Sequence, residues 1–286
     1  ADSHNRLHGH LHQTGTTTGR MSSSDPNLQN IPASQIYGTE IRKGFIATPG
    51  HVLVAADYSQ IELRVLAMLS GDPTLKNIFK TGKDIHTAVA ARVFGVAEDG
   101  VTKDMRRQAK VINFGIIYGM GVNALRVNLG TSREDAQKFY DNYFAEFKTV
   151  REYFDTVVQE AYTKGYTETM FGRHRYFPAL RSKLPFMRAQ AERQAYNAPL
   201  QGTAADIVKI ATVRVDQALG QAKIINQAHF LLQVHDELIY EVEVEHLDKL
   251  VKILQKEMVE VVDNEVPLAV NIETGSSWGE LQEWQN

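Results

Sequence analysis

The sequence predicts an α+β fold in which segments from both ends of the chain form one small antiparallel sheet, with a long helical insertion between them. Three observations carry this prediction. Residues 51–57 are a short apolar run typical of a buried strand, helical periodicity dominates from Ser59 to about Ser182, and two β-like runs flank His235-Asp236-Glu237. Strands at both ends with helices between them favour one sheet shared by distant segments.

The elements between and after these landmarks follow from caps, breakers and periodicity. Residues 14–32 are polar and bounded by Gly and Pro, which predicts an ordered loop or a series of turns. Ser132 followed by acidic residues predicts a helix start, within a helical pattern that continues to about Lys164. Residues 188–219 form a second helical block with a break near Pro199.

The C-terminal part completes the sheet. Residues 229–234 and 238–244 flank His235-Asp236-Glu237 and predict a β-hairpin with its acidic residues at the turn. A helix from about 245 to 262 follows, and residues 267–275 predict a last strand.

Composition limits the class of protein. With 286 residues, 43% of them hydrophobic, the chain can bury a sizeable core. No apolar run approaches the roughly 20 residues of a membrane span, and no signal-peptide pattern opens the chain. The absence of cysteine excludes disulfides and thiolate metal sites. Because the chain begins at Ala1 rather than Met, we expect it to be processed or cut from a longer protein.

The net charge of -3 is unevenly distributed. Residues 101–200 hold 16 Lys and Arg against 10 Asp and Glu, whereas residues 221–286 hold 4 against 13. A basic middle suits phosphate binding and an acidic end suits cations. Ordinary unevenness in a chain of this size is the alternative interpretation, so the asymmetry acquires meaning only from motifs.

Three carboxylates stand where strands end or turn. Asp57 ends the first predicted strand, and Asp236 with Glu237 lies at the predicted hairpin turn. Two carboxylates held there could share a pair of Mg²⁺ ions roughly 3.5–4 Å apart, as two-metal phosphoryl transfer requires. The alternative is that Asp57 is an ordinary turn former and that His235-Asp236-Glu237 is an ordinary turn exposed to solvent.

A basic and aromatic stripe follows residues 105–120. Two cations and two aromatics recur at steps of four residues, which places them along one helix face: Arg106, Lys110, Phe114 and Tyr118. Cations followed by rings match the phosphates, sugar and base of a nucleoside triphosphate. The alternative is an amphipathic helix with aromatic core residues, although Gly115 and Gly119 cost roughly 1 kcal/mol each inside a helix. In the first interpretation the opposite side chains pack inward: Val111, Ile112 and Ile116.

Taken together, these segments resemble the DNA polymerase I family (family A). DYSQIELR at 57–64 and VHDELIYE at 234–241 are similar to its two palm motifs, and RRQAKVINFGIIYG at 106–119 is similar to its finger helix. Three further stretches match in the family's order: TGRMSSSDPNLQNIP (18–32), DIHTAVA (84–90) and NAPLQGTAADIVK (197–209). The resemblance runs from about Leu11 to Trp278.

The resemblance implies a metal site and a nucleotide site. Asp57 and Asp236 would bind two Mg²⁺ ions, with Mn²⁺ as a substitute, the Tyr58 carbonyl would complete one site, and Glu237 would lie close by as a further catalytic residue. Lys110 would also donate a proton to the leaving pyrophosphate. The implied dNTP-binding residues are Gln60, Glu62, His86, Arg106, Lys110, Phe114 and Tyr118.

Within that set the implied roles differ. Phe114 would lie against the sugar, Tyr118 would stack where the template base enters, and Glu62 paired with Tyr118 would block a ribose 2′-hydroxyl. The implied DNA-binding residues are Arg20, Arg193, Asn197, Gln201 and His235. Structural alternatives exist for Glu62 as a charge at a helix N-terminus, for His86 as a surface histidine and for His235 as a turn residue.

The resemblance also implies the domain organisation. We expect residues 1–64 and 224–286 to form a palm and residues 65–223 to form fingers, with the family's thumb and exonuclease domains absent. The expected partners are primer-template DNA, dNTPs and a thumb or exonuclease segment on the same or another chain. No membrane partner is expected. The expected location is cytoplasmic, in a bacterial nucleoid or a phage-infected cell, with an organelle as the alternative.

The expected activity is template-directed joining of dNTPs to a primer 3′-hydroxyl with release of pyrophosphate. One alternative is a non-catalytic DNA-binding fragment that needs a thumb supplied elsewhere. The other is a single-subunit RNA polymerase, against which Glu62 and Phe114 argue because an enzyme that uses ribonucleotides does not need to exclude a 2′-hydroxyl.

Overall fold

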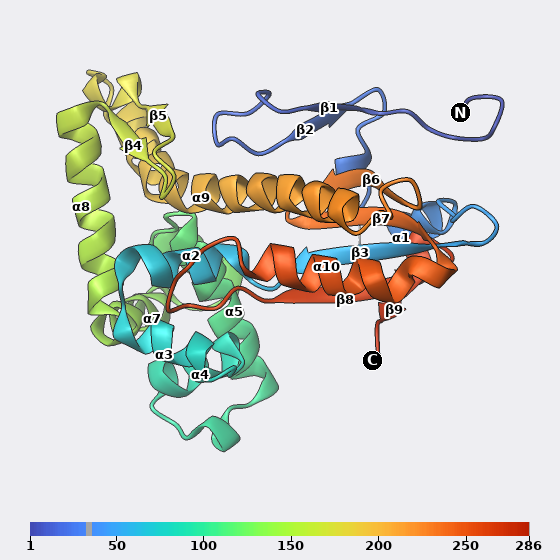
Figure 1. The fold of residues 1–286 in the computed structure, drawn as a ribbon. Coiled ribbons are helices and arrows are strands. Elements are labelled where there is room, and N and C mark those ends of the chain that lie inside the picture. The colour runs from blue at the N-terminus through green and yellow to red at the C-terminus, as the bar shows by residue number, and fades with distance from the viewer. Residues whose placement is uncertain (33–35, 286) are drawn as a thin grey trace. The chain divides into compact units, whose positions relative to one another are not determined.

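The computed structural model describes residues 1–32 and 36–285, and the chain divides into two compact units (Figure 1). The first unit comprises Ala1–Ile61, Ala204–Asp263 and Leu268–Asn286, and the second comprises Glu62–Thr203 and Asn264–Pro267. Compactness alone gives neither unit a role, so the assignment of palm and fingers stays a prediction.

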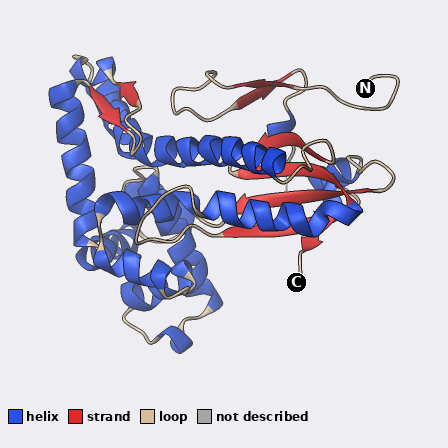
Figure 2. Cartoon of the chain, viewed as in Figure 1, coloured by secondary structure: helices blue, strands red, loops and turns tan. Residues whose placement is uncertain are grey.

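A five-stranded antiparallel sheet forms the centre of the first unit (Figures 1 and 2). In the order β6-β7-β3-β8-β9 the middle strand comes from the N-terminal part of the chain and its neighbours from the C-terminal part. The strands are β3 (His51–Tyr58), β6 (Ala228–Val234), β7 (Glu237–Glu243), β8 (Val270–Gly275) and β9 (Gln282–Glu283). The predicted α+β class, with one sheet built from distant segments, is confirmed.

Strand β3 is apolar along its length because it is buried on both faces. The four residues at 53–56 are all at most 3% exposed, which explains a continuous apolar run where a half-exposed strand would alternate. Leu53 and Ala55 pack on one face with Trp278. On the other face the Tyr58 hydroxyl donates to the Met258 carbonyl in α10 (Leu247–Val259) at 2.7 Å.

The remaining parts of the first unit refine the sequence predictions. The polar stretch at 14–32 contains β2 (Ser22–Ser24), which pairs with β1 (His10–His12). Helix α1 (Ile36–Lys43) precedes β3. A 3₁₀ turn at Val244–His246 replaces the first turn of the helix expected from about residue 245. The last strand begins at residue 270 rather than 267, in keeping with the inability of proline at 267 to donate a ladder hydrogen bond.

The second unit is mostly helical, as its periodicity predicts. Four of its helices begin with a side-chain cap, because Asp72, Asp84, Thr102 and Ser132 each accept a hydrogen bond from a backbone N–H three residues on. The helices are α2 (Ile61–Ser70), α3 (Pro73–Lys80), α4 (Ile85–Phe94), α5 (Lys103–Ile117), α6 (Val122–Leu129), α7 (Arg133–Glu146) and α8 (Lys148–Lys164).

Two features of this unit differ from the sequence predictions. A short hairpin of β4 (Tyr166–Glu168) and β5 (His174–Tyr176) interrupts the helical region. The predicted break near Pro199 is wrong, because α9 (Pro185–Gln221) continues through it. Since the helix turns around Pro199 are buried, their packing outweighs the one backbone hydrogen bond that proline cannot make.

Helix α9 is 37 residues long and is shared between the two units. Neither α9 nor any other helix in the described part of the chain combines the length and apolar composition needed to span a membrane.

Truncating Trp278 should destabilise the first unit strongly. This side chain is 4% exposed and contacts Phe45 edge-to-face at 5.5 Å, with Arg42 over its ring at 4.1 Å. We expect Trp278→Ala to lower the free energy of unfolding by about 3–5 kcal/mol, measured by urea unfolding followed by circular dichroism. The matched control is Tyr37→Ala, which removes an aromatic ring that is 81% exposed. Equal losses for the two variants would contradict the assignment of Trp278 to the core.

Candidate functional site

The register of the sheet brings three acidic residues to one end of β3. Asp57 pairs directly with Glu237 of β7, so both side chains point to the same face of the sheet. Asp236 occupies the two-residue turn between β6 and β7. Its carbonyl accepts a hydrogen bond from the Tyr58 N–H at 3.3 Å, which ties the hairpin turn to the end of β3.

The turn itself is fixed by its neighbours. His235 has φ of 56°, in the left-handed region that such a tight hairpin turn requires. The side-chain amide of Gln233 donates to the His235 carbonyl at 2.8 Å, and the side-chain amide of Gln29 donates to the Gln233 carbonyl at 3.0 Å. Asp236 is therefore presented by a turn that is held in place on both sides.

These carboxyl groups are half-buried without enough compensating positive charge. Burial raises the pKa of Asp57 to about 7, and the charges of Asp236 and Glu273 add to the effect. Burial, reinforced by Asp57, also raises the pKa of Glu237 to about 7, against the opposing charge of Arg42. Burial raises the pKa of Asp236 too, although Arg20 and His235 partly offset it. The group has the chemistry of a site that a bound cation would stabilise.

The donor atoms fit a hard divalent cation. Carboxylate oxygens are the ligands that Mg²⁺ prefers, and one or two carboxylates are usual for it. The Tyr58 side chain points to the opposite face of the sheet and binds α10, so this residue could contribute a ligand only through its backbone. Glu273 on β8 is a nearby acidic residue that the sequence analysis missed, because its proximity depends on the pairing of β8 with β3.

A different acidic group lies at the far end of β7. Within the described ranges, three side chains close enough to share an ion are found only at Glu243, Glu245 and His246. Glu243 is the last residue of β7, and Glu245 and His246 follow in the next turn, so all three are at the opposite end of the strand from Glu237. Each of them is half-buried or exposed. Accessible acidic groups of this kind are common on protein surfaces, so we assign no role to them.

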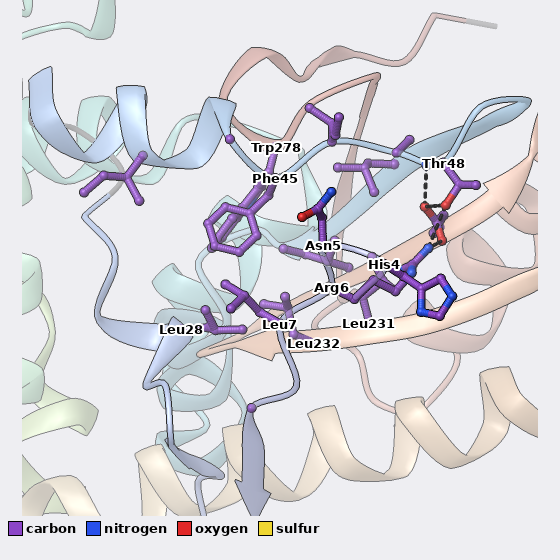
Figure 3. Close-up of a pocket in the computed structure, with 18 of the residues that line it drawn as sticks. His4, Asn5, Arg6, Leu7, Leu28, Phe45, Thr48, Leu231, Leu232 and Trp278 are labelled. Carbon is purple, nitrogen blue, oxygen red and sulfur yellow. Dashed lines mark hydrogen bonds and ion pairs between the residues drawn. The ribbon is translucent and has the colours of Figure 1, made fainter. Parts of the chain in front are cut away.

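A cavity in the first unit is also separate from the three carboxylates. It has a volume of about 870 Å³ and lies against the sheet near Leu53, beneath N-terminal residues such as Arg6 and Leu7 (Figure 3). Leu53 is four residues before Asp57 on β3, a distance of roughly 13 Å along the strand. At one edge Arg6 and Thr48 donate to Glu241 at 2.9 Å each. The cavity is thus distinct from the acidic end of the sheet.

In the second unit, α5 presents the predicted stripe to solvent. Phe114 is 37% exposed and Tyr118, which caps the helix, is 48% exposed. Arg106 and Lys110 are exposed as well, whereas Ile112 and Ile116 are buried and Val111 is half-buried. The alternative, an amphipathic helix with these two aromatic side chains in the core, is therefore wrong.

The two glycines of this segment have structural reasons. Gly119 follows the helix end with φ of +65°, and a Cβ there would lie 3.3–3.4 Å from Tyr196 and Arg193. A Cβ at Gly115 would approach the Met120 sulfur to 2.9 Å. Gly119 lies beyond the helix, so its positive φ explains the glycine and the expected helix-propensity cost does not apply there. At Gly115, inside the helix, a side chain would require Met120 to shift.

Neighbouring helices hold the stripe residues in position. The Arg106 guanidinium donates to Asp84 from Nε at 3.0 Å and from Nη2 at 2.9 Å. His86 is 3% exposed, its Nδ1 lies 3.0 Å from the Asn113 side-chain nitrogen, and its ring centre lies 5.9 Å from that of Phe114. Because it is buried, His86 is no surface histidine, and burial also lowers its pKa.

The other predicted residues occupy varied environments. Glu62 is 7% exposed in the first turn of α2, and Gln60 precedes that helix with φ of 55°. Asn197 donates from its side chain to the Ile117 carbonyl at 3.2 Å, and thereby caps the end of α5. Arg193 is exposed on α9, and Gln201 is half-buried there.

Comparison with known proteins gives the family. The family model described as DNA polymerase family A matches residues 1–280. The chain is 48% identical to the thermostable DNA polymerase I of Thermus filiformis, over 97% of this chain and 33% of that protein. It is 46% identical to the DNA polymerase I of Deinococcus radiodurans, over 96% of this chain and 28% of that protein. This chain spans about a third of the length of these relatives.

A solved structure agrees with these relatives. The POL domain of Pol1 from M. smegmatis, determined in complex with DNA primer-template and dNTP, matches with a TM-score of 0.93 and 43% sequence identity. The match covers 97% of this chain and 49% of that chain. A family model spanning nearly the whole sequence, relatives at almost half identity and a shared fold lead to one conclusion: this chain belongs to DNA polymerase family A.

Proposed function

We propose that the chain catalyses template-directed DNA synthesis, in which a primer 3′-hydroxyl attacks the α-phosphate of a paired dNTP and pyrophosphate leaves. The observation that carries this proposal is that Asp57 and Asp236, from distant segments, lie close together in one half-buried acidic site. Membership of DNA polymerase family A supports it, as does the primer-template and dNTP in the similar solved structure.

The acidic end of the sheet is proposed to hold the metal ions. Asp57 and Asp236 would be the ligands, together with the backbone carbonyl of Tyr58, and Glu237 would lie beside them. Two bound Mg²⁺ ions, or Mn²⁺ in their place, would activate the attacking hydroxyl and stabilise the charge of the leaving pyrophosphate. The protein's own contribution is a rigid sheet that fixes the positions of the carboxylates.

The α5 stripe is proposed to bind the dNTP. Arg106 and Lys110 would contact the triphosphate, and Lys110 would supply a proton to the pyrophosphate as it leaves. The rings of Phe114 and Tyr118 are exposed and available to the sugar and the base. His86 would extend the phosphate contacts and Gln60 would join the dNTP pocket.

The proposed DNA contacts come from polar residues in both units. Arg193, Gln201 and the amide oxygen of Asn197 would belong to one unit, and Arg20 and His235 to the other. In this proposal the first unit corresponds to the palm and the second to the fingers. A thumb or exonuclease segment, on the same or another chain, would be a further partner, since the relatives are about three times as long. A cytoplasmic location stays a prediction.

The first test is primer extension with Mg²⁺ and dNTPs at low salt, where phosphate contacts are strongest. We expect Asp57→Asn and Asp236→Asn each to reduce extension at least about a hundredfold, because each removes a negative ligand from the metal site. Asp248→Asn, at an exposed position on α10, is the control and should keep full activity. DNA binding by the unsubstituted chain without any extension would instead support a non-catalytic fragment.

Without metal, we expect the stability of the protein to fall as the pH rises. The pKa of Asp57 is raised from 3.8 to about 7, so the folded state binds the proton more tightly than the unfolded state. Stability from this group is complete below pH 4 and is lost as the pH rises through 7. Asp57→Asn should therefore be more stable than the parent protein at pH 8 by roughly 2 kcal/mol, allowing for partial solvent screening.

Urea unfolding in the presence of a chelator measures this effect. The gap between Asp57→Asn and the parent protein should grow from pH 5 to pH 8. Added Mg²⁺ at pH 8 should stabilise the parent protein and leave the variant unchanged, because the variant lacks a charged ligand. A gap that is independent of pH would rule out the assigned electrostatics.

Replacing Glu62 tests the exclusion of ribonucleotides. If the buried Glu62 side chain blocks a 2′-hydroxyl, Glu62→Ala should raise the incorporation of ribonucleotides relative to deoxyribonucleotides by roughly tenfold. Glu134→Ala removes an exposed acidic residue from the first turn of α7 and controls for a helix-terminus effect. Unchanged selectivity in Glu62→Ala would refute the steric role, and equal incorporation by the parent chain would indicate an RNA polymerase.

A further inference from the structure

The carboxylate of Asp84 is placed between α4 and α5. Its Oδ2 accepts from Arg106 Nη2 at 2.9 Å, and its Oδ1 accepts from Arg106 Nε at 3.0 Å. The same Oδ1 caps α4 by accepting from the Thr87 N–H at 2.7 Å and from the Thr87 hydroxyl at 2.8 Å. Asp84 is therefore anchored to its own helix and holds Arg106 from there.

This arrangement restricts the Arg106 guanidinium. A bidentate pair fixes the plane of the group, and it uses Nε and Nη2. Within the described residues Nη1 has no hydrogen-bond partner, so it remains available to a ligand. A long and flexible side chain on an exposed helix face thus acquires one orientation before any ligand arrives.

We propose that Asp84 is a positioning residue that orients Arg106 for the triphosphate of the incoming nucleotide. The inference rests on the proposed function, and it assigns Asp84 no contact with the nucleotide itself. Burial would raise the pKa of Asp84, but the hydrogen bonds from Arg106 and Thr87 outweigh burial and hold it at about 2. The carboxylate is therefore charged at every pH at which the enzyme is assayed.

The alternative is that Asp84 occupies the Arg106 guanidinium and competes with phosphate for it, which would weaken nucleotide binding. Two observations favour positioning. The side chains of Arg106 and Asp84 are 48% and 38% exposed, so solvent screens the charge that would repel a phosphate. The bidentate geometry also leaves Nη1 free, so a phosphate need not displace the carboxylate.

The variant Asp84→Asn removes the negative charge of the side chain and one of the two oxygens that accept hydrogen bonds from Arg106. Asparagine caps helices about as well as aspartate, so α4 should keep its start and the thermal melting temperature should stay unchanged. Titration calorimetry with inorganic tripolyphosphate and with dTTP measures the phosphate contacts directly. We expect the dissociation constants of both ligands to rise about tenfold, the scale on which orienting partners affect the groups they hold. In primer extension, KM for dTTP should rise with little change in kcat.

Two controls separate positioning from a general effect of charge. Asp104→Asn removes a carboxylate that pairs at 2.7 Å with Arg107, the neighbour of Arg106 on α5. This variant should leave ligand binding unchanged. In an Arg106→Ala background, Asp84→Asn should have no further effect on binding, because the residue acts through Arg106.

The outcomes distinguish this inference from the proposed function. Tighter binding by Asp84→Asn would identify Asp84 as a competitor of phosphate and overturn the inference. Unchanged binding, or an effect that persists in the Arg106→Ala background, would overturn it as well while leaving the proposed function intact. Failure of the parent chain to bind either ligand would overturn both.

Discussion

The antiparallel register between β3 and β7 is the constraint on which the acidic site depends. It places Asp57 opposite Glu237, and it brings the turn at Asp236 to the end of β3. A shift of one residue would turn Asp57 toward the face that α10 covers. Such a shift is opposed because that face is lined by the buried residues Val54, Ala56 and Tyr58, where the Asp57 carboxylate would lose its hydration.

Two glutamates of β7 show what is unusual about this site. Glu241 is 3% exposed, and its pKa is lowered because hydrogen bonds from Thr48 and Arg6 outweigh its burial. Glu237 is on the same strand and the same face, but burial and neighbouring carboxylates raise its pKa to about 7. The first glutamate is satisfied by the fold. Glu237 lies in a site where burial and neighbouring carboxylates reduce the stability of the folded protein. Such sites are common where binding rather than stability is selected.

The sequence predicted the parts of the molecule whose signal is local. The strand before Asp57, the hairpin around Asp236 and the exposed stripe of α5 all follow from periodicity and turn chemistry. Glu273 and Asp84 were missed because each acquires its role from a neighbour that only the fold supplies: Asp57 across β8 and β3 for the former, Arg106 across two helices for the latter. Pro199 was misjudged for a similar reason, since the packing that preserves its helix is not visible in the local sequence.

The structure gives Asn197 a role that sequence alone did not suggest. Its amide N–H donates to the Ile117 carbonyl, one of the last four carbonyls of α5, which lack partners within the helix. Asp84 holds Arg106 near the opposite end, and Asn113 contacts His86 between them. Helix α5 is thus attached along its length to α4 and α9, while its exposed side chains remain available. A nucleotide site built in this way gains from rigidity, because its contacts are ordered before the ligand binds.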